Sequence, residues 1–145
     1  MTTPERTHSA NHLEGRKVLL AEDNEVAQQQ ILIILRKLGA DVDVSIDGHE
    51  VQERLRNQNY DVLILDIQLP PIHGIELVKE VRKSVPSELK ILGITTMDYK
   101  GRALGAGMNA VLLRPVETVD LVSALLGLFE EDSAQGERAK VAVNG

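Results

Sequence analysis

The sequence Val62-Leu63-Ile64-Leu65-Asp66 is a continuous apolar run that ends in a carboxylate, and residues 18–23 (VLLAED) repeat this pattern. Apolar runs of four to eight residues are typical of strands that are buried on both faces. Further short runs at 91–94 (ILGI) and 111–113 (VLL) extend the series, and residues 42–46 (VDVSI) alternate as a half-exposed strand does. The sequence therefore predicts five strands.

Stretches of helical periodicity separate these strands. From Ala27, apolar residues recur at i+4, i+7, i+8 and i+11, and Gly39 marks the end of this helix. We expect further helices around 51–55, 75–81 and 117–129. The segment 97–108 contains three glycines, each costing about 1 kcal/mol relative to Ala in a helix interior, so its helix should be short or frayed.

The alternation of strands and helices predicts an α/β fold, in which a doubly wound parallel sheet is covered by helices on both faces. A chain of 145 residues fits one domain. We place that domain at residues 16–130, between polar tails at 1–15 and 131–145. His8 and His12 lie in the first tail without other ligands nearby in sequence, so we assign them no metal.

Composition excludes several classes of function. The formal net charge is −6 and there is no basic stripe, so direct binding of nucleic acid is not expected. The absence of Cys removes thiolate metal sites and disulfides, and aromatic residues are only 2%, too few to hold a flavin. No segment approaches the roughly 20 apolar residues of a membrane span, and no apolar leader is recognisable. We expect a cytoplasmic protein whose partners are proteins or cations.

Charged and hydroxyl side chains follow the predicted strands. Ligands bind beyond the carboxyl ends of the strands in such sheets, where Glu22-Asp23, Asp66, Thr95 and Arg114 would converge. Each residue alone has a structural explanation, because Asp23 could cap a helix and Asp66 a turn. Three carboxylates in one crevice nevertheless repel one another, which favours a bound cation.

Oxygen ligands without His or Cys suit Mg²⁺, which points to phosphoryl chemistry. Asp66 is the best candidate nucleophile, because it stands alone at its strand end, whereas Glu22 and Asp23 form an adjacent pair suited to holding a metal. The Thr95 hydroxyl and the Arg114 guanidinium could then contact the phosphoryl oxygens.

At these residues the chain resembles the receiver domain of two-component response regulators, over about residues 16–130. The motifs that carry the resemblance are Leu19-Leu20-Ala21-Glu22-Asp23-Asn24, Ile64-Leu65-Asp66-Ile67-Gln68-Leu69-Pro70 with Gly74, Ile94-Thr95-Thr96, Ala106-Gly107-Met108 and Arg114-Pro115. The resemblance implies the strand order 2-1-3-4-5. It also implies phosphorylation of Asp66 by a histidine kinase or a histidine phosphotransfer protein, and a downstream protein target.

The resemblance also assigns roles to single residues. Glu22, Asp23, Asp66 and the backbone carbonyl of Gln68 would hold Mg²⁺, and Thr95 would be the switch hydroxyl. The side chain of Gln68 would tune the lifetime of the phosphoryl group. A cis peptide bond would precede Pro115. Such a protein is a signalling phosphoacceptor that assists its own phosphoryl transfer and hydrolysis, and is not an enzyme.

Several departures from the family pattern concern switching. Arg114 replaces the family's Lys, and Val111 stands where an aromatic switch residue is usual. The segment between Thr95 and Arg114 is about three residues shorter than is typical, nearly one helical turn. Thr96, where Ala is commoner, adds bulk beside the acceptor. We expect order and disorder in the shortened segment to matter more than rigid rotation.

Other classes fit less well. A P-loop enzyme needs a Gly-rich loop ending in Lys-Ser or Lys-Thr, and a haloacid-dehalogenase-type phosphatase needs a second Asp at position 68, where this chain has Gln. A flavodoxin needs a Ser/Thr-rich phosphate cradle after the first strand. The main alternative is a degenerate receiver that docks proteins without phosphorylation. In either case the chain could be a single-domain regulator or a receiver from a hybrid kinase.

Overall fold

The computed structural model describes residues 12–85 and 88–133. Its five strands are all parallel and form one sheet in the order β2-β1-β3-β4-β5, which confirms the predicted fold and strand order. The strands are β1 (Lys17–Ala21), β2 (Asp41–Ser45), β3 (Val62–Asp66), β4 (Lys90–Thr95) and β5 (Ala110–Leu113). Ala21 pairs with Leu65, so the residues that follow them, Glu22 and Asp66, emerge side by side.

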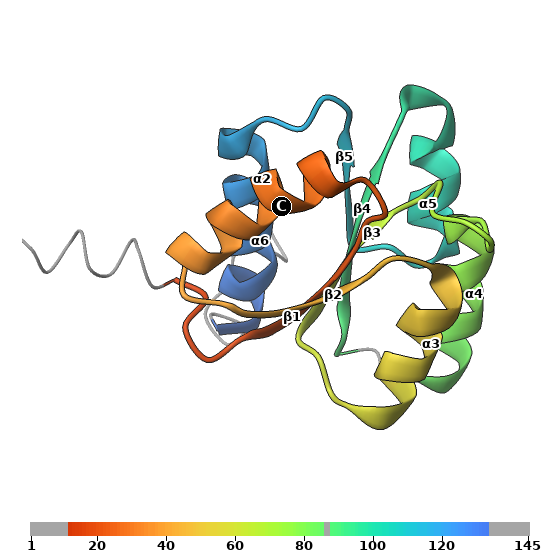
Figure 1. The fold of residues 1–145 in the computed structure, drawn as a ribbon, viewed down its shortest axis with the longest axis horizontal. Helices are drawn as coiled ribbons and strands as arrows, with labels where there is room; N and C mark the ends of the chain where they lie inside the picture. Colours follow the sequence, from red (N-terminus) through yellow and green to blue (C-terminus); the bar gives the residue numbers. More distant parts are fainter. Residues whose placement is uncertain (1–11, 86–87, 134–145) are drawn as a thin grey trace, which may run out of the picture.

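Helices cover both faces of the sheet. Helices α2 (Glu25–Lys37) and α6 (Thr118–Ser133) lie on one face, and α3 (Gly48–Asn57), α4 (Gly74–Ser84) and α5 (Lys100–Ala106) lie on the other (Figure 1). A short 3₁₀ helix, η1 (Met97–Tyr99), precedes α5. With only seven residues, α5 is as short as its glycines predict.

The sheet separates two hydrophobic clusters because successive side chains of a strand point to opposite faces. Leu19 and Ala21 of β1 pack with α3, α4 and α5, whereas Val18 and Leu20 pack with α2 and α6. All four of these side chains are completely buried. Burial on both faces is the reason that β1 and β3 are continuously apolar in sequence.

Helix ends are fixed by local polar contacts. The Asn24 side chain accepts a hydrogen bond from the N–H of Ala27 at 2.9 Å, so Asn24 is the N-cap of α2 and Asp23 is not. Asp47 caps α3 in the same way through the N–H of Glu50. Gly39 has φ of 90°, which confirms the predicted glycine C-terminus of α2.

The structure corrects several predicted boundaries. Leu13, which sequence analysis placed in the tail, is completely buried, and its N–H donates to the Leu38 carbonyl at 2.8 Å. Ile46 lies after β2 and is 57% exposed, so its alternation does not continue the strand. Helix α6 extends to Ser133, beyond the predicted limit at 130. His12 is exposed, and residues 1–11 and 134–145 of the predicted tails, which include His8, lie outside the described residues.

Gly74 starts α4 against the backbone of the loop that follows Asp66. Its N–H donates to the Ile67 carbonyl at 2.6 Å, and a Cβ at Gly74 would lie 2.6 Å from the Cα of Ile67. This approach holds the turn that follows Asp66 against the first residues of α4. A side chain at position 74 would have to displace backbone.

We predict that Gly74→Ala lowers the free energy of unfolding by about 1–3 kcal/mol, because the new methyl group meets backbone atoms of Ile67. Gly105→Ala is the matched control, since nothing lies within 4 Å of a Cβ there. The control should raise the free energy of unfolding by about 0.5–1 kcal/mol through helix propensity. Urea denaturation of both variants measures the difference, and equal effects would contradict this explanation.

We also predict that Leu13→Ala lowers the free energy of unfolding by about 2–5 kcal/mol, because it leaves a cavity beside α2 and α6. Val119→Ala is its control, because Val119 is 71% exposed and should not lower this free energy. The same denaturation experiment tests both substitutions. A Leu13→Ala variant as stable as the parent would show that residues before 16 do not belong to the folded unit.

Candidate functional site

Three carboxylates lie together at the carboxyl end of the sheet. Carboxylate oxygens of Glu22, Asp23 and Asp66 all lie within 4.8 Å of one another. Glu22 and Asp66 are buried, with 2% and 8% of their surface exposed, whereas Asp23 is exposed. The predicted convergence of these residues is therefore present, and it follows directly from the parallel pairing of β1 with β3.

Asp66 ends β3 and is held by the turn that follows it. Its Oδ1 accepts a hydrogen bond from the N–H of Gln68 at 3.0 Å, and its backbone carbonyl accepts one from the N–H of Leu69 at 3.1 Å. The side chain of Gln68 is exposed beside this turn. The other oxygen, Oδ2 of Asp66, lies 3.1 Å from Nη2 of Arg114.

Glu22 is held from several directions. Its Oε2 accepts a hydrogen bond from the N–H of Asn24 at 3.2 Å, and its Oε1 accepts one from Arg114 at 3.2 Å. Burial raises the pKa of the Glu22 carboxyl, and the nearby charge of Asp66 also raises it, although the hydrogen bonds from Asn24 and Arg114 act in the opposite direction. Negative charge is therefore unfavourable here without a cation.

Arg114 follows β5 and reaches back to the acidic residues. One nitrogen, Nη2, lies 3.2 Å from Glu22 Oε1 and 3.1 Å from Asp66 Oδ2. The side chain is 35% exposed, so the guanidinium stands between the acidic cluster and solvent. The peptide bond between Arg114 and Pro115 is cis, as predicted, and a second cis bond joins Pro70 to Pro71, which sequence analysis did not predict.

Thr95 ends β4 beside β3, the strand that ends in Asp66. Its residue is completely buried, and its hydroxyl has no hydrogen-bond partner among the described residues. Buried hydroxyls are usually paired, so this one is a donor without an acceptor. The neighbouring Thr96 is exposed, and its side chain is not part of the buried site.

Sequence analysis missed two supporting residues. Gln28 donates from Nε2 to the backbone carbonyl of Glu22 at 2.6 Å, which fixes the start of the loop after β1. His73 caps α4 through Nδ1 and lies against Tyr99, with ring centroids 4.9 Å apart. The contact joins the loop after Asp66 to the segment after Thr95. For Gln28, the sequence signal that could have suggested this role is its position one turn after the start of α2.

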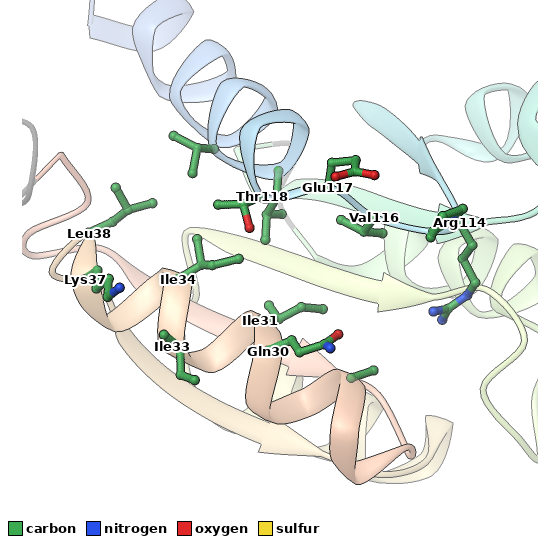
Figure 2. Close-up of a pocket in the computed structure, with 14 residues that line it drawn as sticks. Gln30, Ile31, Ile33, Ile34, Lys37, Leu38, Arg114, Val116, Glu117 and Thr118 are labelled. Atoms are coloured by element: carbon green, nitrogen blue, oxygen red, sulfur yellow. The ribbon is translucent and has the colours of Figure 1, made fainter.

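A groove of about 1240 Å³ runs between α2 and the start of α6, with Arg114 at one end (Figure 2). Its lining is mainly apolar, from Ile31, Ile34 and Leu38 of α2 and Val116, Leu121 and Val122 near or on α6. Large apolar grooves with a few polar groups are typical of binding surfaces.

In the part of the chain that the structure describes, no helix is long and apolar enough to cross a membrane.

Comparison with known proteins shows the same architecture in signalling proteins. The chain is 35% identical over 121 residues to the aerobic respiration control sensor protein ArcB of Escherichia coli K12, covering 81% of this chain and 15% of ArcB. It is 33% identical over 129 residues to hybrid signal transduction histidine kinase K of Dictyostelium discoideum, covering 81% and 11%. The chain thus spans only a small part of these curated relatives.

Solved structures agree with this similarity. The receiver domain of a sensor histidine kinase from Pseudomonas aeruginosa PAO1, solved with a magnesium ion coordinated in its active site cleft, matches with a TM-score of 0.68 and 30% identity. The match covers 78% of this chain and 98% of that one. The chemotaxis response regulator CheY4 of Vibrio cholerae matches with a TM-score of 0.72 and 28% identity over 78% and 98% of the chains.

The family model described as the response regulator receiver domain matches residues 18–126, which include β1 after Lys17, the other four strands and every member of the acidic cluster. The order of the strands and the relatives agree with that match. The chain belongs to the receiver domains of two-component response regulators.

Proposed function

We propose that Asp66 accepts a phosphoryl group from a histidine kinase or a histidine phosphotransfer protein, and that the chain then signals by altered contacts with a downstream protein. The observation that carries this proposal is the convergence of three carboxylates around one buried aspartate at the end of β3. Membership of the receiver family supports it.

The acidic cluster fits a hard divalent cation because its donors are all oxygen atoms. Glu22, Asp23, Asp66 and the backbone carbonyl of Gln68 would hold Mg²⁺. A bound Mg²⁺ neutralises charge on the phosphoryl oxygens during transfer. Without a cation, the phosphoryl group would approach three carboxylates at once, and their repulsion would oppose transfer.

The protein residues position the reaction. The hydrogen bond from Gln68 to Oδ1 of Asp66 orients the carboxylate, so that Oδ2 would be the oxygen that attacks phosphorus once Arg114 has released it. The bond between phosphorus and the donor breaks as the bond to Oδ2 forms, which yields an acyl phosphate. Arg114 would then donate to phosphoryl oxygens, because it follows β5 beside this site and lies within 3.1 Å of Oδ2 before a metal binds.

Thr95 would respond to the phosphoryl group on Asp66 by forming a hydrogen bond with it. Its buried hydroxyl is without a partner among the described residues, and an adjacent phosphoryl oxygen would supply an acceptor. The gain of this hydrogen bond would shift the population toward a state in which Thr95 and the segment after it move inward. In this role the chain is a phosphoacceptor that assists its own phosphoryl transfer and hydrolysis, with Gln68 beside the acceptor tuning the lifetime.

A phosphorylation-independent docking module is the second candidate. The apolar groove between α2 and α6 supports it, because a protein could bind there without any change at Asp66 (Figure 2). The residue at position 111 also supports it, because the half-buried Val111 has no aromatic ring to rotate. Covalent modification of Asp66 distinguishes the two candidates.

We predict that incubation with acetyl phosphate and Mg²⁺ adds about 80 Da to the protein, the mass of one covalent phosphoryl group. Asp66→Asn should abolish the adduct, and so should removal of metal by a chelator. Asp98→Asn is the matched control, since Asp98 is an exposed carboxylate in η1 and should leave the adduct intact. Intact-mass spectrometry measures all four samples.

An adduct that persists in Asp66→Asn would assign the acceptor to another residue. If the parent protein forms no adduct, beryllofluoride replaces the acyl phosphate as a stable analogue, and binding is followed by the change in amide resonances. A protein that responds to neither reagent would be a docking module.

We predict that beryllofluoride with Mg²⁺ changes amide hydrogen exchange in residues 97–108, because this segment follows Thr95 and contains only a seven-residue helix. Residues 48–57 of α3 are the internal control and should exchange at an unchanged rate. Exchange followed by mass spectrometry measures both regions. Equal protection of residues 97–108 with and without the analogue would argue against a switch in this segment.

A further inference from the structure

We propose that the guanidinium of Arg114 competes with the divalent cation for Glu22 and Asp66, so that this one side chain sets the metal affinity of the site. The inference rests on the proposed function, because it assigns the metal to the same acidic cluster. It goes beyond that function by giving Arg114 a role before any phosphoryl group arrives.

The geometry shows which oxygen atoms the guanidinium uses. Backbone N–H groups of Asn24 and Gln68 hold Glu22 Oε2 and Asp66 Oδ1. The remaining oxygen of each carboxylate, Glu22 Oε1 and Asp66 Oδ2, is 3.2 Å and 3.1 Å from Arg114 Nη2. Arg114 therefore occupies the two carboxylate oxygens that the backbone leaves over, and it does so with a single nitrogen atom.

A divalent cation needs the same carboxylates. Mg²⁺ requires ligand oxygens at about 2.0–2.1 Å, much closer than a guanidinium nitrogen approaches. Two cations that share one pair of carboxylates repel each other strongly in a partly buried site. Metal binding at Glu22 and Asp66 must therefore weaken or break the bridge made by Arg114.

Arginine is well suited to this competition. Its charge cannot be removed by deprotonation near neutral pH, so the bridge does not relax by losing a proton. The bridge is an ion pair with buried carboxylates, which is stronger than an exposed one. A metal must displace a permanent cation at this position.

The groove also offers space into which the guanidinium of Arg114 can move when it leaves the carboxylates. The side chain of Arg114 is 35% exposed and lines the end of the groove between α2 and α6, where there is space beside it (Figure 2). Asp23 is exposed and has no ion pair with Arg114 in the described part of the chain. An approaching cation can thus contact Asp23 first and then replace Arg114 on the two buried carboxylates.

The first test is a calorimetric Mg²⁺ titration of the parent protein, Arg114→Gln, Arg114→Lys and a control, Arg56→Gln. Arg114→Gln should bind Mg²⁺ about five-fold or more tightly than the parent, the usual lower end of a coupling between two sites. Arg114→Lys should bind with intermediate affinity, since lysine keeps the positive charge but carries it on a flexible stem that holds the bridge less rigidly. Arg56 is exposed on α3, and its variant loses the same charge, so its affinity should change less than about two-fold.

The second test uses the parent protein alone and does not depend on a variant that folds. Addition of Mg²⁺ should shift the ¹⁵N–¹H resonance of Arg114 Nε, because the guanidinium leaves its carboxylates. Arg82 is the internal control, since its Nε donates to the Gly107 carbonyl at 3.0 Å and its other nitrogens bond Leu89 and Asn109. The Arg82 resonance should stay in place during the titration.

The outcomes separate this inference from the proposed function. If the parent binds Mg²⁺ and Arg114→Gln binds it equally or more weakly, competition is wrong while the proposed metal site stands. An Arg114 resonance that ignores saturating Mg²⁺ overturns the inference in the same way. If none of the four proteins binds Mg²⁺, the metal site itself is wrong, and the proposed function fails together with this inference.

Discussion

The parallel pairing of β1 with β3 is the constraint on which the rest of the site depends. Pairing of Ala21 with Leu65 places Glu22 and Asp66 next to each other where both strands leave the sheet. The helices on both faces bury these strand ends, so two carboxylates meet where water is scarce. A cation stabilises the charged form of both carboxylates there, and in this chain Arg114 supplies one.

Much of this arrangement can be predicted because it depends on strand pattern alone. The continuous apolar runs at β1 and β3 indicate burial on both faces, and parallel strands bring their ends to one edge, which places Glu22, Asp23 and Asp66 together before any coordinates are known. The glycines of residues 97–108 similarly predict a short α5, since each weakens the helix independently of tertiary packing.

Other features could not be predicted because they depend on how side chains pack in three dimensions. The sequence indicates that Arg114 follows its strand. It does not indicate that one nitrogen atom of Arg114 contacts two carboxylates, because this contact depends on the rotamer of Arg114 and on distances across the sheet. Leu13 has polar neighbours in sequence and looks like part of a tail, yet it fills space beside α2. The contact of His73 with Tyr99 joins two loops that no sequence periodicity relates.

The two halves of the site belong to strands of very different burial. Asp66 ends β3, all five residues of which are buried and which has a neighbouring strand on each side. Arg114 follows β5, one of the two edge strands, whose four residues are only half-buried. Local opening is easier where burial is low, so Asp66 stands at the end of a rigid strand, while Arg114 follows a strand that opens more easily. Freedom to move is thus concentrated at Arg114, while Asp66 is held in place by the strands around it.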